Sequence, residues 1–128
     1  MKRETNSCII GIGSNIDAEI NIRKMLEILG RKVKVEKVST FKRTKPIGIT
    51  QQEDFTNGAV RIETSLSAEQ LKQVLVQIED DLGRDRTLPK FGPRTMDLDI
   101  VVWNGKIVDD DYFNRDFLKS SIEEISSI

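Results

Sequence analysis

Short apolar runs alternate with helical repeats in the first third of the chain. Residues 8–12 form an apolar run that is followed by Gly-Ser-Asn at residues 13–15, a pattern typical of a buried strand that ends in a tight turn. After Asp17, a candidate N-cap, apolar residues recur at helical spacing. The pattern predicts a helix that ends at Gly30.

The middle of the chain predicts two strands and one clearly marked helix. Residues 33–44 alternate loosely between apolar and polar side chains, and residues 56–64 form a second strand-like stretch, so we expect the two to pair as antiparallel neighbours. Ser67 and Gln70 then form a capping box, which predicts the start of a helix that ends at Gly83. The buried stripe of this helix consists of Leu71, Val74, Leu75, Ile78 and Leu82.

A last strand over residues 96–103 leads into Asn104-Gly105, a pair typical of hairpin turns. The order strand, helix, strand, strand, helix, strand predicts an α+β fold. It is the order of the ferredoxin-like βαββαβ arrangement, in which two helices pack on one face of a mainly antiparallel sheet. The pattern of residues 122–128 predicts that the chain ends in a short helix or a frayed segment. We expect one domain over residues 1–128, because this length suits a single compact unit.

Composition excludes several classes of protein. Lys and Arg number 20 against 21 Asp and Glu, a net charge of -1, so no global basic field attracts nucleic acid and any anion site is local. The chain has no histidine, which excludes histidine metal ligands, histidine bases and Ser-His or Cys-His arrangements. Cys8 lies in an apolar run, and we interpret it as a small buried hydrophobe. No apolar run is long enough for a membrane span, so we expect a cytoplasmic protein with no membrane partner.

Two aspartates lie in the last predicted strand. Asp97 and Asp99 are two residues apart, so strand periodicity points both carboxylates to one face, while Leu98, Ile100 and Val102 point to the other. Ionised neighbours repel each other, so without a cation one of them would take up a proton. Oxygen ligands without Cys or His suit magnesium. From these residues alone the alternative stays open that Asp97 is solvated and Asp99 is salt-bridged to an arginine.

A basic loop precedes the aspartate pair. It carries Arg84, Arg86, Lys90 and Arg94, separated by glycines and prolines whose bends can direct several side chains to one point. Arginine forks bind phosphate oxygens, and magnesium bridges phosphates to carboxylates, so this neighbourhood favours a polyphosphate ligand. The alternative is a solvated loop, or one paired with the helix acids Asp80 and Asp81.

An aromatic residue and an amide lie at the start of the strand over residues 56–64. Phe55 and Asn57 would let a flat heterocycle stack on a ring and form hydrogen bonds with an amide. Packing of Phe55 in the core, with Asn57 in a turn, is the alternative.

Five motifs occur in order along the chain: Gly-Ser-Asn at 13–15, Thr-x-Pro-x-Gly at 44–48, Phe-x-Asn at 55–57, Gly-Arg-x-Arg at 83–86 and Gly-Pro-Arg-Thr-Met-Asp-Leu-Asp at 92–99. Over about residues 8–120 the chain thereby resembles the 6-hydroxymethyl-7,8-dihydropterin pyrophosphokinase family, and the last motif is the most specific. The resemblance implies transfer of the β,γ-diphosphate of ATP to the hydroxymethyl group of the dihydropterin in folate biosynthesis, with release of AMP.

The resemblance also implies roles for individual residues. Asp97 and Asp99 would hold two magnesium ions. The implied catalytic residues are Arg84, Arg94 and Asp97, and the implied nucleotide contacts are Glu79, Arg84, Arg86 and Arg94. The implied pterin site consists of Thr44, Pro46, Phe55, Asn57, Arg115 and Phe117, with the two phenylalanines on either side of the ring and Asn57 at its edge.

The chain departs from the family pattern at three places. Phe91 stands where the family usually has a tryptophan, Asp109 stands where it usually has a histidine that reaches the ATP phosphates, and the chain ends at Ile128 where typical members continue. A carboxylate at position 109 would repel phosphate, so a relative that binds nucleotide or pterin without turnover is the alternative function. A ferredoxin-like RNA-binding domain fits less well, because only 5% of the residues are aromatic and the net charge is -1. The sequence does not indicate an oligomeric state.

Overall fold

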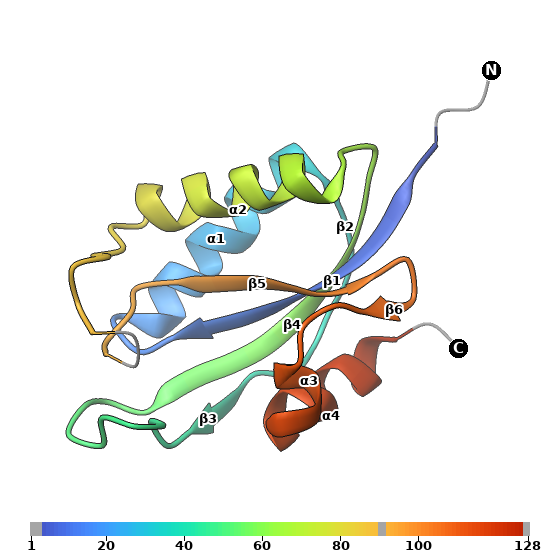
Figure 1. Ribbon diagram of the computed structural model, residues 1–128. Coiled ribbons are helices and arrows are strands. Elements are labelled where there is room, and N and C mark those ends of the chain that lie inside the picture. Colours follow the sequence, from blue (N-terminus) through green and yellow to red (C-terminus); the bar gives the residue numbers. More distant parts are fainter. Residues whose placement is uncertain (1–3, 90–91, 127–128) are drawn as a thin grey trace.

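The structure is a computed structural model that describes residues 4–89 and 92–126 (Figure 1). Its elements are β1 (Asn6–Ser14), α1 (Ala18–Lys32), β2 (Lys34–Val38), β3 (Lys42–Thr44), β4 (Phe55–Thr64), α2 (Ala68–Asp81), β5 (Asp97–Trp103), β6 (Lys106–Ile107), α3 (Asp111–Asn114) and α4 (Asp116–Ile125). Within these ranges, no helix combines the length and the apolar character that a bilayer crossing requires.

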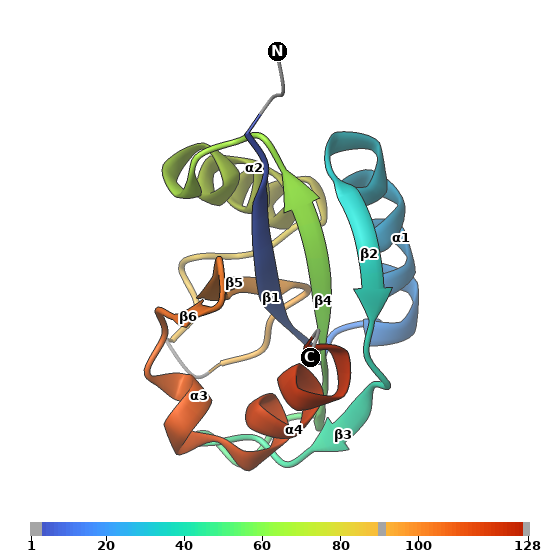
Figure 2. The same ribbon diagram turned by 90° about the vertical axis from the view of Figure 1, so that its right-hand side faces the viewer.

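The strands form one antiparallel sheet. Their order is β2-β4-β1-β5-β6, and β3 pairs with β4 beside the end of β2. The helices α1 and α2 cover one face of this sheet, whereas α4 lies against the other face (Figures 1 and 2). The predicted α+β, ferredoxin-like arrangement is confirmed, and so is the antiparallel pairing of β2 with β4. The two predicted helices on one face are observed, and α3 and α4 add a partial second layer, of which the sequence predicted only a short helical or frayed end at residues 122–128.

Two apolar clusters account for the two layers. The strands alternate between faces, so Ile10 packs with Met25 under α1 and α2, whereas its neighbour Ile9 packs on the opposite face. There it meets Ile122 and Ile125 of α4, both of which are buried. The predicted short helical end is therefore the last part of a helix that begins at Asp116 and packs on this face of the sheet.

Several local signals are confirmed. Ser67 and Gln70 form the reciprocal capping box at the start of α2. Gly83 follows this helix with a φ of +83°, a conformation that favours glycine. Asn104 and Gly105 both have positive φ in the turn between β5 and β6.

Two boundary predictions were wrong, and a third, the N-cap at Asp17, was right in position only. The helix α1 continues through Gly30 to Lys32, because nothing crowds that position and the helix ends only where Val33 becomes extended. Asp17 occupies the N-cap position, but its φ is +44° and its side chain caps no backbone group. Residues 33–44 form two strands, since Ser39 leaves the ladder and its hydroxyl accepts a hydrogen bond from the backbone of Ala59.

The strand β5 departs from simple alternation. Ile10 of β1 pairs with Ile100, but Ile9 pairs with Val102, so Val101 is an extra residue in a bulge. Leu98 therefore packs with the larger cluster as predicted, whereas Val102 packs with the smaller cluster on the opposite face. The prediction that Val102 shares the face of Leu98 was wrong for this reason.

Candidate functional site

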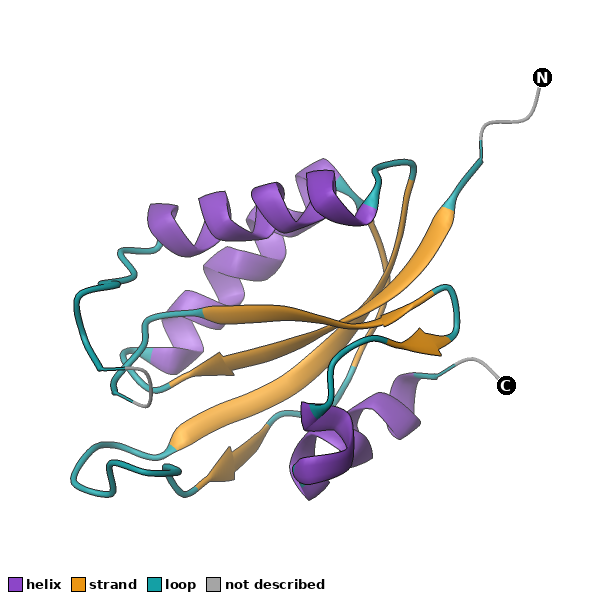
Figure 3. Cartoon of the chain, in the orientation of Figure 1, coloured by secondary structure: helices purple, strands orange, loops and turns teal. Residues whose placement is uncertain are grey.

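A pocket lies on the sheet face that α4 covers only in part. Figure 3 shows the loops after α2 and between β3 and β4 at one end of the sheet, away from the α4 helix. The pocket has a volume of about 420 Å³, within the range of small-molecule sites. Gly11 and Gly13 of β1 form part of its floor, and because they lack side chains they leave this part of the face open.

The structure brings nine of the twelve predicted site residues into this pocket. These are Thr44, Phe55, Asn57, Arg84, Arg94, Asp97, Asp99, Arg115 and Phe117. Pro46, Glu79 and Arg86 do not line it. Residues 90–91, with the basic Lys90 and the departure at Phe91, lie outside the described residues.

Asp97 is held by two arginines from the preceding loop. Arg84 Nη1 donates to Asp97 Oδ1 at 3.0 Å, and Arg94 Nη1 donates to Asp97 Oδ2 at 2.9 Å. All three side chains are largely buried. The alternative in which Asp97 is merely solvated is therefore wrong.

Asp99 has a different environment, although strand geometry points it into the same pocket. Its side chain lines the pocket, but the neighbouring protein atoms remove part of its hydration, which disfavours the charged form. This burial, followed by repulsion from the carboxylates of Asp97, Asp109 and Glu79, raises the pKa of Asp99 to about 7. The raised pKa of Asp99 agrees with the expectation that one of the two carboxylates takes up a proton without a cation, whereas the ion pairs of Asp97 were not predicted.

The donor set fits magnesium. A cation beside Asp99 would relieve the repulsion among these carboxylates, and the donors are hard oxygens without Cys or His. Among the described residues no group of three or more Asp, Glu, Cys or His is arranged to hold a metal alone. Magnesium usually takes one or two carboxylates and completes its shell with water and substrate phosphates.

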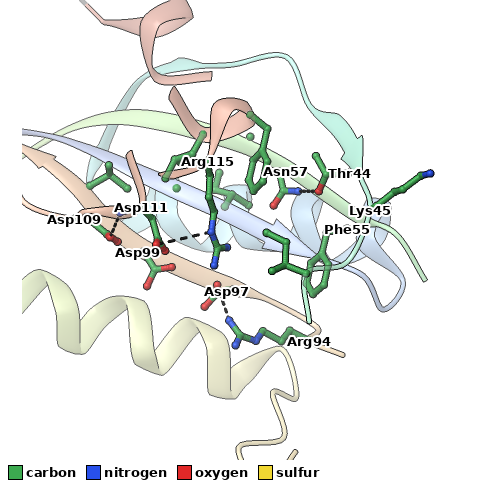
Figure 4. A pocket seen from close by; sticks show the side chains of 18 of the residues that line it. Thr44, Lys45, Phe55, Asn57, Arg94, Asp97, Asp99, Asp109, Asp111 and Arg115 are labelled. Carbon is green, nitrogen blue, oxygen red and sulfur yellow. Dashed lines mark hydrogen bonds and ion pairs between the residues drawn. The ribbon is translucent and has the colours of Figure 1, made fainter. Parts of the chain in front are cut away.

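The opposite half of the pocket carries the residues suited to a flat ligand. Asn57 Nδ2 donates to Thr44 Oγ1, which fixes the amide, and Phe55 lies beside them (Figure 4). Phe117, at the start of α4, lines the same pocket. The alternative in which Phe55 packs in the core is not what the structure shows. Phe55, Asn57 and Phe117 line the pocket instead.

The Gly-Ser-Asn turn holds the loops around the pocket together. Asn15 bonds to Arg94 through both backbone and side chain, at 3.0 and 2.8 Å, and its Nδ2 donates to Gln52 Oε1 and to the carbonyl of Glu53. Ser14 Oγ donates to the carbonyl of Thr95 at 2.6 Å. The motif was part of the resemblance, but this supporting role was not predicted, because the loops that it joins are distant in sequence.

Arg86 lies at the edge of the arginine loop and pairs with acids of α2. Its Nη2 is 2.9 Å from Glu79 Oε1 and 3.1 Å from Asp80 Oδ1. These bonds, with that to Glu79 the strongest, raise the pKa of Arg86 above its ordinary value. The alternative that the loop pairs with helix acids therefore holds for Arg86 and Asp80, while Asp81 bonds to Gln77.

The segment between β6 and α4, together with α4 itself, adds pocket residues, of which the family resemblance had pointed to Asp109 but not to Asp111 or Leu118. Asp111 lines the pocket, and its Oδ1 is 3.8 Å from Arg115 Nε. Asp109 also lines the pocket and accepts a hydrogen bond from the backbone of Asp111 at 2.9 Å. Leu118 closes the wall next to Gly11. An acidic run of this kind usually marks a solvated loop, so the pattern alone did not place these residues at a site.

Comparison with known proteins supplies the family. The model of the 7,8-dihydro-6-hydroxymethylpterin-pyrophosphokinase (HPPK) family matches residues 9–127. A 2-amino-4-hydroxy-6-hydroxymethyldihydropteridine pyrophosphokinase of Bacillus subtilis is 43% identical over 102 residues, which cover 77% of this chain and 60% of the relative. The bifunctional protein FolKE of Lactococcus lactis subsp. cremoris is 34% identical, with 92% of this chain and 37% of the relative covered.

A third relative is covered more fully. The 2-amino-4-hydroxy-6-hydroxymethyldihydropteridine pyrophosphokinase of Haemophilus influenzae is 33% identical, with 92% of this chain and 80% of the relative covered. The chain thus spans less than two thirds of the first two relatives and most of this one. The extent of the family match and these identities show that the chain belongs to the 7,8-dihydro-6-hydroxymethylpterin-pyrophosphokinase family.

Proposed function

We propose that this chain, as a single domain over residues 1–128, transfers the β,γ-diphosphate of ATP to 6-hydroxymethyl-7,8-dihydropterin in folate biosynthesis and releases AMP. The observation that carries the proposal is the composition of one pocket. Arginines and aspartates suited to a magnesium-bound triphosphate line one half, and an amide with two aromatic rings lines the other. A reaction that joins a polyphosphate to a flat heterocycle needs both halves within one cavity.

The reaction suits a chain without histidine. The hydroxymethyl oxygen of the pterin attacks the β-phosphorus of ATP, the bond from that phosphorus to the α,β-bridging oxygen breaks, AMP leaves and the hydroxyl proton is released. Such a transfer depends on positioning and on neutralisation of charge more than on a strong base. Arginine and carboxylate side chains therefore suffice for the protein's part.

The charged half of the pocket would bind the nucleotide. Arg84 and Arg94 lie where their guanidinium groups can bind triphosphate oxygens. Hydrogen bonds to Asp97 hold both side chains in place before the nucleotide binds. Asp97 and Asp99 would hold two magnesium ions, which when bound supply positive charge to the transferred diphosphate. Arg86 does not line the pocket, but its side chain is half-exposed at the edge of the loop and would contact the nucleotide from there.

The other half would bind the pterin. The Asn57 amide, fixed by Thr44, presents hydrogen-bonding groups to the ring edge, while Phe55 and Phe117 offer ring faces for stacking. Pro46, in the loop that follows Thr44, would complete the pterin site that the family resemblance implies. Arg115 reaches in from the start of α4 and lies between the two halves of the pocket (Figure 4).

The test is a product analysis. Protein, magnesium, ATP and hydroxymethyl-dihydropterin should yield AMP and the pterin diphosphate in equal amounts. Asp97→Ala and Asp99→Ala should each lower the rate by about a hundredfold or more. Glu69→Ala, at an exposed position in the first turn of α2, is the matched control and should keep the rate. ADP as the only nucleotide product would contradict the proposed reaction.

A second function, binding without turnover, is favoured by one observation. Asp109 lines the pocket, and its charge contributes to the raised pKa of Asp99. Calorimetry that finds tight ATP and pterin binding with no AMP formed would support it. In that case Asp109→His, which removes the negative charge, should produce or raise AMP formation, whereas the Asp110→His control should not.

A further inference from the structure

Glu79 is a buried carboxylate that does not line the pocket. Its side chain is 4% exposed, and it lies in the last turn of α2. There the helix dipole disfavours negative charge, so neither helix stability nor solvation accounts for an acidic residue. Burial of an ionised group is costly unless hydrogen bonds satisfy its oxygens, so the partners of Glu79 indicate what it does.

The first partners are two arginines of the loop that follows α2. Arg84 Nη1 donates to Glu79 Oε2 at 2.8 Å, and Arg86 Nη2 donates to Glu79 Oε1 at 2.9 Å. Arg84 also donates to Asp97, so its guanidinium lies between two carboxylates on separate elements. Glu79 thus fixes one side of an arginine whose other side faces the pocket.

The third partner is the backbone of β5. Leu98 N donates to Glu79 Oε2 at 2.8 Å. At this level β5 is the edge of the sheet, because β6 pairs only with Val102 and Trp103. The bond therefore joins α2 to the strand at the residue between Asp97 and Asp99.

We propose that Glu79 is a positioning residue that couples the arginine loop to the aspartate pair and so preforms the triphosphate site. It acts through Arg84, Arg86 and the Leu98 amide and does not touch the nucleotide. This role differs from the direct nucleotide contact that the family resemblance implied. The inference rests on the proposed function in one respect, since it takes ATP as the ligand of Arg84.

The test compares Glu79→Gln with Glu69→Gln, a control on the exposed side of the same helix. Glutamine keeps the length but presents an NH2 group to one of the donors. We expect the Kd for ATP with magnesium to rise at least about tenfold, because charge-assisted hydrogen bonds are lost. The Kd for the pterin, bound by the other half of the pocket, should change by less than about twofold. Amide exchange at Leu98 should become faster, and the control should change none of these values.

The outcomes separate this inference from the proposed function. If the unmodified protein forms no AMP but binds ATP, the proposed function fails, and the ATP affinity and Leu98 exchange still decide the role of Glu79. Unchanged ATP affinity in Glu79→Gln would overturn the inference, as would equal losses for ATP and pterin, which would indicate a general structural role. An unmodified protein without ATP affinity would overturn both. If Glu79→Gln does not fold, Glu79→Asp, one methylene shorter, gives the same comparison.

Discussion

Arg94 Nη1 and Asp97 Oδ2 lie 2.9 Å apart, three residues from each other along the chain. With Arg84 on the other oxygen, Asp97 is a carboxylate whose charge is balanced within the protein. Asp99, two residues later, faces the like charges of Asp97 and Asp109. The same residue type therefore has opposite effects on the folded state at two adjacent positions of one strand face.

This difference predicts stability changes of opposite sign. Asp97→Asn should lower the free energy of unfolding by about 1–3 kcal/mol, because it removes charge-assisted hydrogen bonds and leaves two largely buried arginines without that partner. Asp99→Asn should raise the free energy of unfolding, because it removes a repelled carboxylate. Urea unfolding in the presence of a chelator, at a pH of about 8, measures both values. Losses of similar size in the two variants would contradict the assignment of paired and repelled carboxylates.

The raised pKa of Asp99 predicts a pH dependence of stability. Because the folded protein holds this proton more tightly than the unfolded chain, Asp99 costs no stability at low pH, and stability is lost as the pH rises from about 4 towards about 7. Other carboxyl groups titrate in the same range, so the quantity to measure is the difference between the unmodified protein and Asp99→Asn. That difference should grow with pH and level off above about pH 8 without metal.

Magnesium should reverse this effect. The ion competes with the proton for the Asp99 carboxylate, so saturating magnesium with ATP should remove most of the difference between the two proteins at high pH. A difference that stays constant from about pH 5 to about pH 8 would show that Asp99 has an ordinary pKa.

Much of the fold followed from local signals in the sequence. The capping box of Ser67 and Gln70 and the positive φ of Gly83 depend on neighbouring residues only, so their patterns predicted the structure. The helix α4 was only partly predicted, because its buried face rests on few apolar residues and becomes clear only when the second face of the sheet is known. The bulge at Val101 was missed since it depends on register with β1.

For the candidate site, too, the features set by neighbouring residues were predicted and those set by distant residues were not. Asp97 and Asp99 were placed on one face by strand periodicity, and the pocket holds both. The resemblance placed Glu79 at the nucleotide, but its contacts with Leu98 and two arginines arise from the packing of α2 against β5, which no motif records. Residues whose partners are distant in sequence were the ones that sequence patterns could not assign.

The continuation of α1 through Gly30 predicts a stabilising substitution. Gly30 is exposed in the last turn of α1, and a Cβ there would meet nothing within 4 Å. Gly30→Ala should therefore raise the free energy of unfolding by about 0.5–1 kcal/mol through its helix propensity. Gly83→Ala is the matched contrast, because its φ of +83° is strained for alanine, and it should lower stability. A loss of stability in Gly30→Ala would indicate that the helix ends there after all.

The position of Gly13 predicts that a substitution there lowers the affinity for the pterin but not the affinity for ATP. A Cβ at this position would lie 3.0 Å from Asn57 Oδ1 and 3.8 Å from Phe55 Cδ1, so it would displace the amide that Thr44 now fixes. Gly13→Ala should weaken pterin binding by about tenfold, as expected when one hydrogen-bonding group is misplaced, and should leave ATP affinity within about twofold. Calorimetry with each ligand measures this, and Gly30→Ala, remote from the pocket, is the control for a glycine-to-alanine change. Equal losses for both ligands would show that Gly13 supports the whole pocket, and no loss would show that Asn57 does not read the pterin edge.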